Sequence, residues 1–214
     1  MSVQAYQQLQ DLQSLLQPIQ QNNVPDCWFN RQPQEQYSSI RLYHTFFDME
    51  PRHSIFRYLW KAAAILRYNF FFWLLIHDRI NTRNLLQRKT FNVPSASCVL
   101  CDHETDETSY HLIWDYPFAL GCWDSITTHR QRGISIYDEI INSRFAYPKG
   151  IAMDIIIMGS WHIWMQRNDF IFKNKIPSIT NWRRRMRKDL NLLQHRIKAK
   201  HSQTLTDWTR DFFN

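Results

Sequence analysis

Three side chains in the middle of the chain could together hold a metal ion. Cys98 and Cys101 are separated by two residues, and His111 follows ten residues after the second cysteine. The short turn between the cysteines can direct both sulfur atoms to one point, and zinc takes thiolate and imidazole ligands tetrahedrally. We therefore expect Cys98, Cys101 and His111 to bind Zn²⁺. The alternative is a pair of buried free cysteines beside a surface histidine.

The residues on either side of this motif form a longer pattern. It runs through Phe70-Phe-Phe-Trp-Leu-Leu-Ile-His-Asp-Arg-Ile-Asn-Thr-Arg-Asn-Leu-Leu, Cys98-Val-Leu-Cys101, Glu107-Thr108, His111-Leu112, Pro117-Phe118 and Cys122-Trp123. Dense from about residue 55 to 125, this pattern resembles the reverse-transcriptase zinc-binding domain near the C-terminal end of plant non-LTR (LINE-type) retrotransposon polyproteins. It continues more weakly through 161–168 and 182–185. The resemblance implies a C-terminal accessory fragment that supports a polymerase lying upstream.

The resemblance also implies a ligand set of Cys, Cys, His and Cys, in which the last cysteine directly precedes Pro117. The first three ligands fall on Cys98, Cys101 and His111, but the fourth falls on Tyr116. A neutral phenol with a pKa near 10 is a poor zinc ligand.

Several groups could replace the missing thiolate. Asp115 or a water molecule is the expected substitute, and His103 and Asp102 are chemically competent, whereas Cys122 is expected to be a core thiol. We predict weak zinc binding through Cys98, Cys101 and His111, with Asp115 as a candidate ligand. The alternative is a metal-free knuckle held in place by the packing of Leu112, Trp114 and Trp123.

Helices must position this motif. Glycine is scarce, with 4 residues in 214, whereas aromatic residues make up 15% and apolar residues 44% of the chain, and alternation typical of strands is nowhere sustained. The sequence therefore predicts an all-α fold, a multi-helix aromatic-rich bundle with a small zinc-knuckle-like insertion. We expect a Gln-rich arm or short helix over 1–25, a helical domain over 26–130 containing the knuckle (98–116), and a helical region over 131–214 with a basic helix at 182–200.

Capping residues and apolar spacing predict where individual helices lie. Thr82 and Ser135 are expected N-caps, and Pro117 is expected to be the first residue of a helix. A short amphipathic helix is expected before Pro18, another is possible over 38–47, and a long one over 151–173. Two apolar stripes are predicted to face inward: Leu66, Phe70, Trp73, His77 and Ile80, and then Trp182, Met186, Leu190, Leu193 and Ile197.

Charge is segregated along the chain. Residues 52–89 and 182–200 each contain 8 basic residues and 1 acidic residue, whereas residues 98–116 contain five acidic residues and no lysine or arginine. Phosphates are therefore expected to avoid the knuckle and to contact flanking basic helices. The candidate nucleic-acid contacts are Arg183, Arg184, Arg185, Arg187 and Lys188, with Arg79, Arg83, Arg88 and Lys89 as a second group. The alternative for each group is an ordinary solvated helix face.

Other function classes find little support in the sequence. No polymerase carboxylate motif, P-loop or nucleophile elbow occurs, so we expect a non-catalytic protein without a small-molecule substrate. No apolar run is long enough to cross a membrane, and the expected location is intracellular, nuclear or cytoplasmic. We predict nonspecific binding of RNA or DNA in support of a reverse transcriptase. The alternatives are a helical module that docks to upstream reverse transcriptase domains, and a decayed retroelement fragment with a lost metal site.

Overall fold

The chain divides into two units, Met1–Pro51 and Arg52–Asn214. The computed structural model describes residues 3–18, 38–40, 54–101, 105–127 and 131–213. In the first unit, residues Val3–Leu16 form helix α1, one of the two forms expected for residues 1–25. The helix predicted over 38–47 lies mostly outside the described residues.

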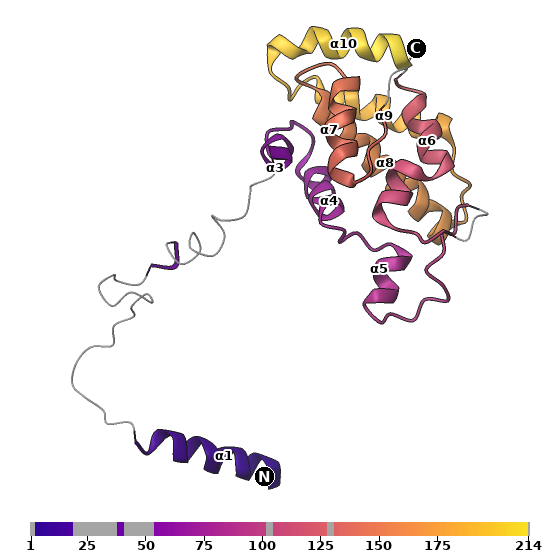
Figure 1. Cartoon of the computed structure of the whole chain (residues 1–214). Coiled ribbons are helices and arrows are strands. Elements are labelled where there is room, and N and C mark those ends of the chain that lie inside the picture. The colour runs from indigo at the N-terminus through magenta and orange to yellow at the C-terminus, as the bar shows by residue number, and fades with distance from the viewer. Residues whose placement is uncertain (1–2, 19–37, 41–53, 102–104, 128–130, 214) are drawn as a thin grey trace. The chain divides into compact units, whose positions relative to one another are not determined.

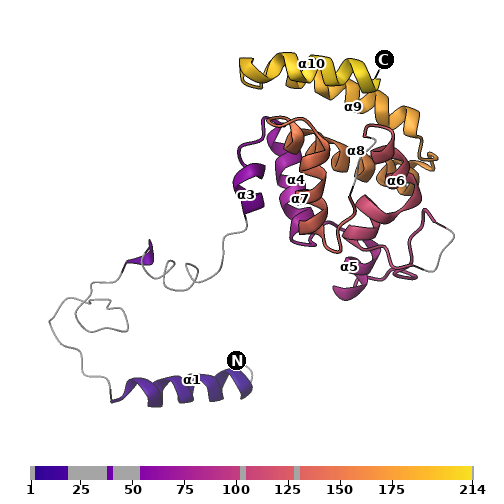
Figure 2. The same ribbon diagram turned by 45° about the horizontal axis from the view of Figure 1, so that its top comes forward.

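The second unit is built around α8 (Ala152–Lys173), whose residues 152–160 are all buried and, apart from Asp154 and Ser160, are apolar or glycine. Helices α4 (Leu66–Ile76), α6 (Pro117–Asp124), α7 (Ile136–Ala146) and α9 (Ile179–Leu193) pack against it. Figures 1 and 2 show α10 (Ala199–Phe213) alongside α9, at the opposite end of this unit from α5 (Arg83–Arg88). A further short helix, α3 (Ser54–Leu59), packs on α4 and α7.

The predicted all-α class is confirmed for the described residues. Their regular elements are helices, and β pairing among them is confined to an isolated antiparallel bridge between Ser97 and Asp106. None of the described helices combines the length and the apolarity needed to cross a membrane.

Local sequence signals locate several helix ends. The Thr82 hydroxyl accepts a hydrogen bond from the backbone N–H of Leu85, and the Ser135 hydroxyl accepts one from that of Asp138. These bonds satisfy N–H groups that have no partner within their own helices. Pro117 is the first residue of α6. The three predicted helix starts are thus confirmed.

The inward stripe predicted for α4 is wrong. Leu66 and Phe70 are 72% and 53% exposed, whereas Phe72 and Leu75 are fully buried. Almost every position of this helix is apolar, so apolar spacing by itself leaves the orientation of the helix about its axis undetermined. The packing of α4 on α8 and α3 determines which side is buried.

The C-terminal helix prediction is partly correct. Trp182, Met186, Leu190 and Leu193 are buried along α9 as expected. However, α9 ends at Leu193, and α10, which the sequence analysis did not anticipate, begins at Ala199. The predicted basic helix over 182–200 is therefore interrupted.

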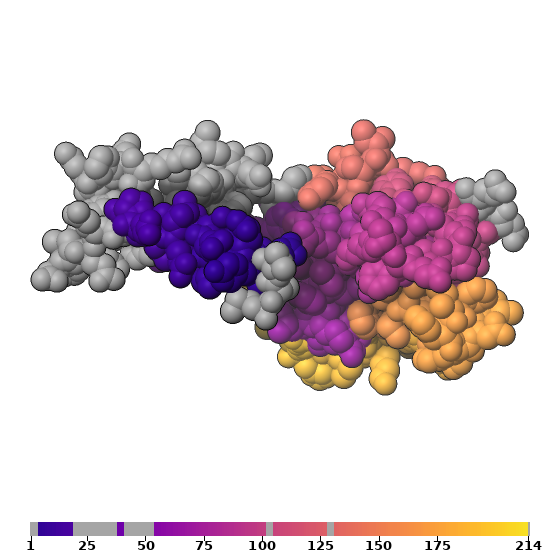
Figure 3. All heavy atoms as spheres, turned by 90° about the horizontal axis from the view of Figure 1, so that it is seen from below, coloured from indigo at the N-terminus to yellow at the C-terminus, as the bar shows by residue number. Residues whose placement is uncertain are grey.

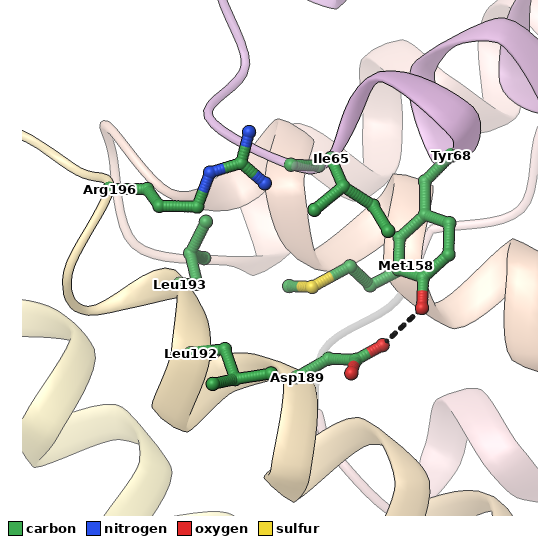
Figure 4. A pocket seen from close by; sticks show the side chains of 8 residues that line it. Ile65, Tyr68, Met158, Asp189, Leu192, Leu193 and Arg196 are labelled. Carbon is green, nitrogen blue, oxygen red and sulfur yellow. Dashed lines mark hydrogen bonds between the residues drawn. The ribbon is translucent and has the colours of Figure 1, made fainter.

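A shared carboxylate connects three helices in the interior. The Asp189 carboxylate of α9 accepts hydrogen bonds from the Tyr68 hydroxyl at 2.7 Å and from the His162 Nε2 at 2.9 Å. Burial raises the pKa of Asp189, but the hydrogen bonds from His162 and Tyr68 outweigh burial and hold it below its usual value. Figure 4 shows Tyr68 and Asp189 at the wall of a cavity of about 70 Å³. This cavity is too small for an ordinary ligand.

Candidate metal centre

A short hairpin positions the two cysteines. The backbone N–H of Cys98 donates to the Thr105 carbonyl, and that of Glu107 donates to the Ala96 carbonyl, both at 2.8 Å. These bonds hold together the two segments on either side of the turn, so Cys98 is fixed at the start of the turn. The tip, residues 102–104, lies outside the described residues.

The histidine lies on an unusual helical turn. Residues His111–Asp115 form a π-helical turn, η1, in which the backbone N–H of Tyr116 donates to the His111 carbonyl at 2.7 Å. The Thr108 hydroxyl accepts the backbone N–H of His111 at 3.0 Å. Such turns contain one extra residue compared with an α-helical turn and often occur at functional sites. Here the turn holds the His111 side chain in the interior, 6% exposed.

The structure brings the three predicted ligands together. One ligand atom from each of Cys98, Cys101 and His111 lies within 4.8 Å of the others, and the Cys101 Sγ is 3.5 Å from the His111 Nε2. Tetrahedral zinc with ordinary bond lengths places a sulfur and a nitrogen ligand about 3.6 Å apart. The donor set therefore fits zinc in its chemistry, and the spacing of Cys101 and His111 fits two ligands of one ion.

Asp115 contacts the other side of the imidazole. Its Oδ2 lies 3.4 Å from the His111 Nδ1, whereas the His111 Nε2 is turned toward Cys101. Its Oδ1 lies 3.8 Å from the Arg132 guanidinium. A carboxylate at Nδ1 favours the tautomer that leaves Nε2 free to bind a metal. The structure thus places Asp115 behind His111 and outside the group of three ligand atoms.

The remaining candidates for a fourth ligand are placed differently. Tyr116 is buried, with its ring centroid 6.1 Å from that of His111. Cys122 is completely buried, and burial raises the pKa of its thiol, so it is a core thiol as expected. Asp102 and His103 lie outside the described residues. Among the described residues, the cluster that could hold a metal consists of Cys98, Cys101 and His111.

The two cysteines differ in environment. Cys98 is buried, and this burial raises the pKa of its thiol to about 12, while Cys101 is partly exposed. A thiolate is the form that binds zinc. A divalent cation would supply the charge that holds the buried Cys98 sulfur in this form.

A buried ion pair ties the knuckle to α8. The Arg167 guanidinium donates from Nη2 to the Glu107 Oε1 at 2.5 Å and from Nε to the Oε2 at 3.3 Å. The same Oε1 accepts the backbone N–H of Arg83 at 2.9 Å, at the start of α5. In Figure 3 the magenta surface that includes α5 adjoins the orange surface of the later helices.

Sequence analysis did not find this pairing. The sequence suggests Glu107 as part of the family pattern and of the acidic knuckle, and Arg167 as part of the weaker match at 161–168, but it does not suggest that the two side chains pair. The available signal was an arginine inside a long, mainly apolar helix, since such a charge needs a partner when buried.

The basic residues of α9 fall into two groups. Arg183 donates to the Ser125 carbonyl at 2.6 Å and to the Phe212 carbonyl, and Arg185 forms an ion pair with Asp169 at 2.7 Å. Both side chains are partly buried. The other three, Arg184, Arg187 and Lys188, are exposed.

The second basic group divides in the same way. Arg83 is partly buried and donates to the Ser97 carbonyl at 3.2 Å, and Arg88 forms an exposed ion pair with Asp78. Arg79 and Lys89 are exposed. Several of the predicted contact residues are therefore already bound to neighbouring groups in the fold.

One comparison with known proteins gives a match. Residues 37–123 match the family described as zinc-binding in reverse transcriptase. No curated protein and no solved structure is significantly similar to the chain. The match contains all three clustered ligands and ends before Arg167, the ion-pair partner of Glu107. Residues 37–123 are therefore similar to the reverse-transcriptase zinc-binding family, as the sequence pattern predicted.

Proposed function

We propose that the knuckle binds one zinc ion through Cys98, Cys101 and His111, with Asp115 orienting His111 and a water molecule completing the coordination. The supporting observation is the convergence of three ligand atoms within 4.8 Å in a segment that matches a zinc-binding family. The competing arrangement is one in which the Asp115 carboxylate itself binds the zinc ion as the fourth ligand. Zinc would supply a cation that fixes the knuckle, so its role is structural.

We propose that the chain is a non-catalytic accessory region that binds RNA or DNA without sequence preference in support of a reverse transcriptase. The exposed cations Arg184, Arg187 and Lys188 support this role on α9, and Arg79 and Lys89 support it near α5. Arg183, Arg185, Arg83 and Arg88 would contribute mainly by holding these surfaces in place. The proposed setting is a LINE-type element of plants, in the nucleus or cytoplasm.

A second candidate is docking to upstream reverse transcriptase domains. The observation that favours it is a group of exposed apolar side chains on and near α4: Trp60 is 50% exposed, Leu66 72% and Phe70 53%. Contiguous exposed apolar patches mark protein interaction surfaces, and these three side chains would contribute to such a patch. Binding through this surface would depend only weakly on salt.

Zinc analysis tests the metal proposal. We expect the purified chain to contain zinc, to lose it on Cys98→Ser substitution, and to melt at a lower temperature after chelation. The Tyr116→Cys variant should hold zinc more tightly, because it supplies the thiolate implied by the family pattern. Stoichiometric zinc in that variant alone would show that the natural site has lost its metal.

Binding to an unrelated oligonucleotide over a range of salt concentrations tests the nucleic-acid proposal. Charge reversal of Arg184, Arg187 and Lys188 together should weaken binding and reduce the salt slope by about 2 to 3, because each lost phosphate contact removes about 0.7 to 0.9. Lys175→Glu, an exposed charge reversal outside this group, is the control. Unchanged retention of the triple variant at low salt would reject this surface, and a shallow salt slope would favour docking.

A further inference from the structure

A cleft on the second unit has the composition of a site for single-stranded nucleic acid. It measures about 640 Å³ and lies among α3, the end of α7 and the start of α8. This volume is within the range of ligand-binding clefts. Its lining includes three cations and three aromatic rings: Lys61, Arg144 and Lys149, with Tyr58, Phe145 and Tyr147.

The cations of this cleft are available to an anionic ligand. Lys61 and Lys149 are exposed and Arg144 is partly so. Among the ion pairs formed between described residues, none involves these three side chains. The Arg144 guanidinium instead lies over the Tyr58 ring, 3.4 Å from its centroid. A phosphate backbone would supply the missing negative charge.

The single carboxylate in the lining, Asp154, is buried and hydrogen-bonded to the backbone. The Asp154 side chain is 3% exposed, and its Oδ1 accepts the backbone N–H of Ala64 at 2.7 Å. The lining therefore keeps an excess of positive charge at its accessible surface.

The aromatic side chains at the cleft favour unpaired bases as the ligand. Phe145 is 86% exposed and Tyr58 is 36% exposed. Aromatic rings beside cations form stacking platforms for single strands, because each base offers a flat face to the ring. A duplex hides those faces within its own stack, so it could use the cations but not the rings.

One residue of the cleft lining, Gly150, lies against α10. Gly150 has a φ of 103°, and a Cβ at this position would lie 2.3 Å from the His201 ring. Only glycine allows both this backbone conformation and this contact.

We propose that this cleft binds a single-stranded segment of RNA or DNA, with phosphates on Lys61, Arg144 and Lys149 and a base stacked on Phe145. This proposal rests on the proposed function, because it keeps nucleic acid as the ligand. It adds a second site, separate from α9, that binds unpaired nucleotides. The lining contains none of the exposed α9 cations, so the two sites can be tested separately.

The test uses the full chain and labelled oligouridylate and oligodeoxyuridylate of about 12 nucleotides, which differ only at the 2′ position and have a length suited to a single-strand site. Phe145→Ala should raise the Kd for both single strands about tenfold, by loss of one stacked base, and leave the Kd for a duplex unchanged. Lys149→Glu should weaken binding of single strands and duplex alike. The matched controls are Phe172→Ala, at 75% exposure, and Lys175→Glu. A preference for one of the two single strands distinguishes RNA from DNA as the ligand.

Three results would overturn the cleft assignment. One is a Phe145→Ala variant that binds single strands as the Phe172→Ala control does. Another is competition by polyglutamate as strong as competition by an oligonucleotide, which would assign the cleft to an acidic peptide. The third is loss of binding only on charge reversal in α9, in which case the proposed function stands without the cleft. Absence of oligonucleotide binding by the unmodified chain would reject both proposals.

Discussion

Glu107 and Arg167 form a two-point ion pair in which the side chains are 0% and 5% exposed. The pair joins the metal-binding segment to α8, across 60 residues of sequence. Because the family match ends at residue 123, the segment that carries the ligands depends for its buried charge balance on a helix beyond that match.

Breaking this pair should be among the most destabilising single changes in the protein. We expect Arg167→Met to lower the free energy of unfolding by about 3 to 5 kcal/mol, because it leaves a buried carboxylate without its cation. Adding Glu107→Gln to Arg167→Met should restore part of the loss. Urea denaturation measures both effects.

An exposed pair offers the matched control. Arg88 is 53% exposed and its partner Asp78 is 42% exposed, so Arg88→Met should cost less than about 1 kcal/mol. Equal losses in the Arg167 and Arg88 variants would contradict the importance given to the buried pair.

Replacing Asp115 distinguishes a ligand from a positioning residue. If the carboxylate only orients His111 through Nδ1, Asp115→Asn should weaken zinc affinity by about 10- to 100-fold and leave the stoichiometry at saturation unchanged. Competition with a chromogenic chelator measures the affinity. Asp124→Asn, an exposed change on α6, should have no effect. A complete loss of metal comparable to that of Cys98→Ser would instead make Asp115 a direct ligand.

Asp154 should give the unfolding free energy an uncommon pH dependence. Burial raises its pKa to about 6, against backbone hydrogen bonds from Ala64 and Ala63 and the charge of Arg196, which lower it. The folded state therefore binds this proton more tightly than the unfolded state, whose pKa is about 3.9. The contribution of Asp154 to stability is most favourable below pH 4 and declines as the pH rises through 6.

Comparison with Asp154→Asn isolates this effect. The stability of the variant relative to the natural chain should rise between pH 4 and pH 7 by an amount on the order of 3 kcal/mol. Chemical denaturation at each pH provides the measurement. The contribution of Asp189 to stability has the opposite pH dependence, because its pKa is lowered in the folded state. That contribution is lost as the pH falls. A constant difference between natural chain and variant over this range would show that Asp154 is not desolvated as described.

Gly159 should tolerate no larger side chain. A Cβ at this position would lie 2.5 Å from the Trp123 ring, and the Gly159 carbonyl accepts the Trp182 indole N–H at 3.1 Å. We expect Gly159→Ala to lower the free energy of unfolding by about 1 to 3 kcal/mol, because the added methyl group overpacks the core.

Gly121→Ala is the matched control for the Gly159 variant. Its Cβ would meet the Ile179 Cδ1, the end of a flexible side chain, at 2.8 Å. It should therefore lower the melting temperature less. Equal effects of the two substitutions would contradict the rigid packing of the tryptophans against α8.

Local signals allowed several elements to be predicted from sequence, and tertiary contacts decided the rest. Thr82 and Ser135 act through residues three positions away, so their caps could be recognised from the sequence. The orientation of α4 depends on its neighbours, since its sequence is apolar on every side. The sequence predicts that Arg183 is an exposed surface charge. In the structure its guanidinium donates to the backbone carbonyls of Ser125, 58 positions before it, and Phe212, 29 positions after it.

The candidate metal centre shows the same division. Cys98, Cys101 and His111 were identifiable because their spacing has chemical meaning on its own. The location of Asp115 behind the imidazole was not, because it depends on the local geometry of η1, which residue spacing does not reveal.

The π-helical turn at His111–Asp115 makes the number of residues in this segment part of the metal centre. Deleting one residue between His111 and Pro117 would favour an ordinary α-helical turn and rotate the histidine by about 100° relative to α6. All three candidate ligands would still be present in such a chain, but the imidazole would face away from the cysteines. Length changes here should therefore be as damaging to metal binding as loss of a ligand.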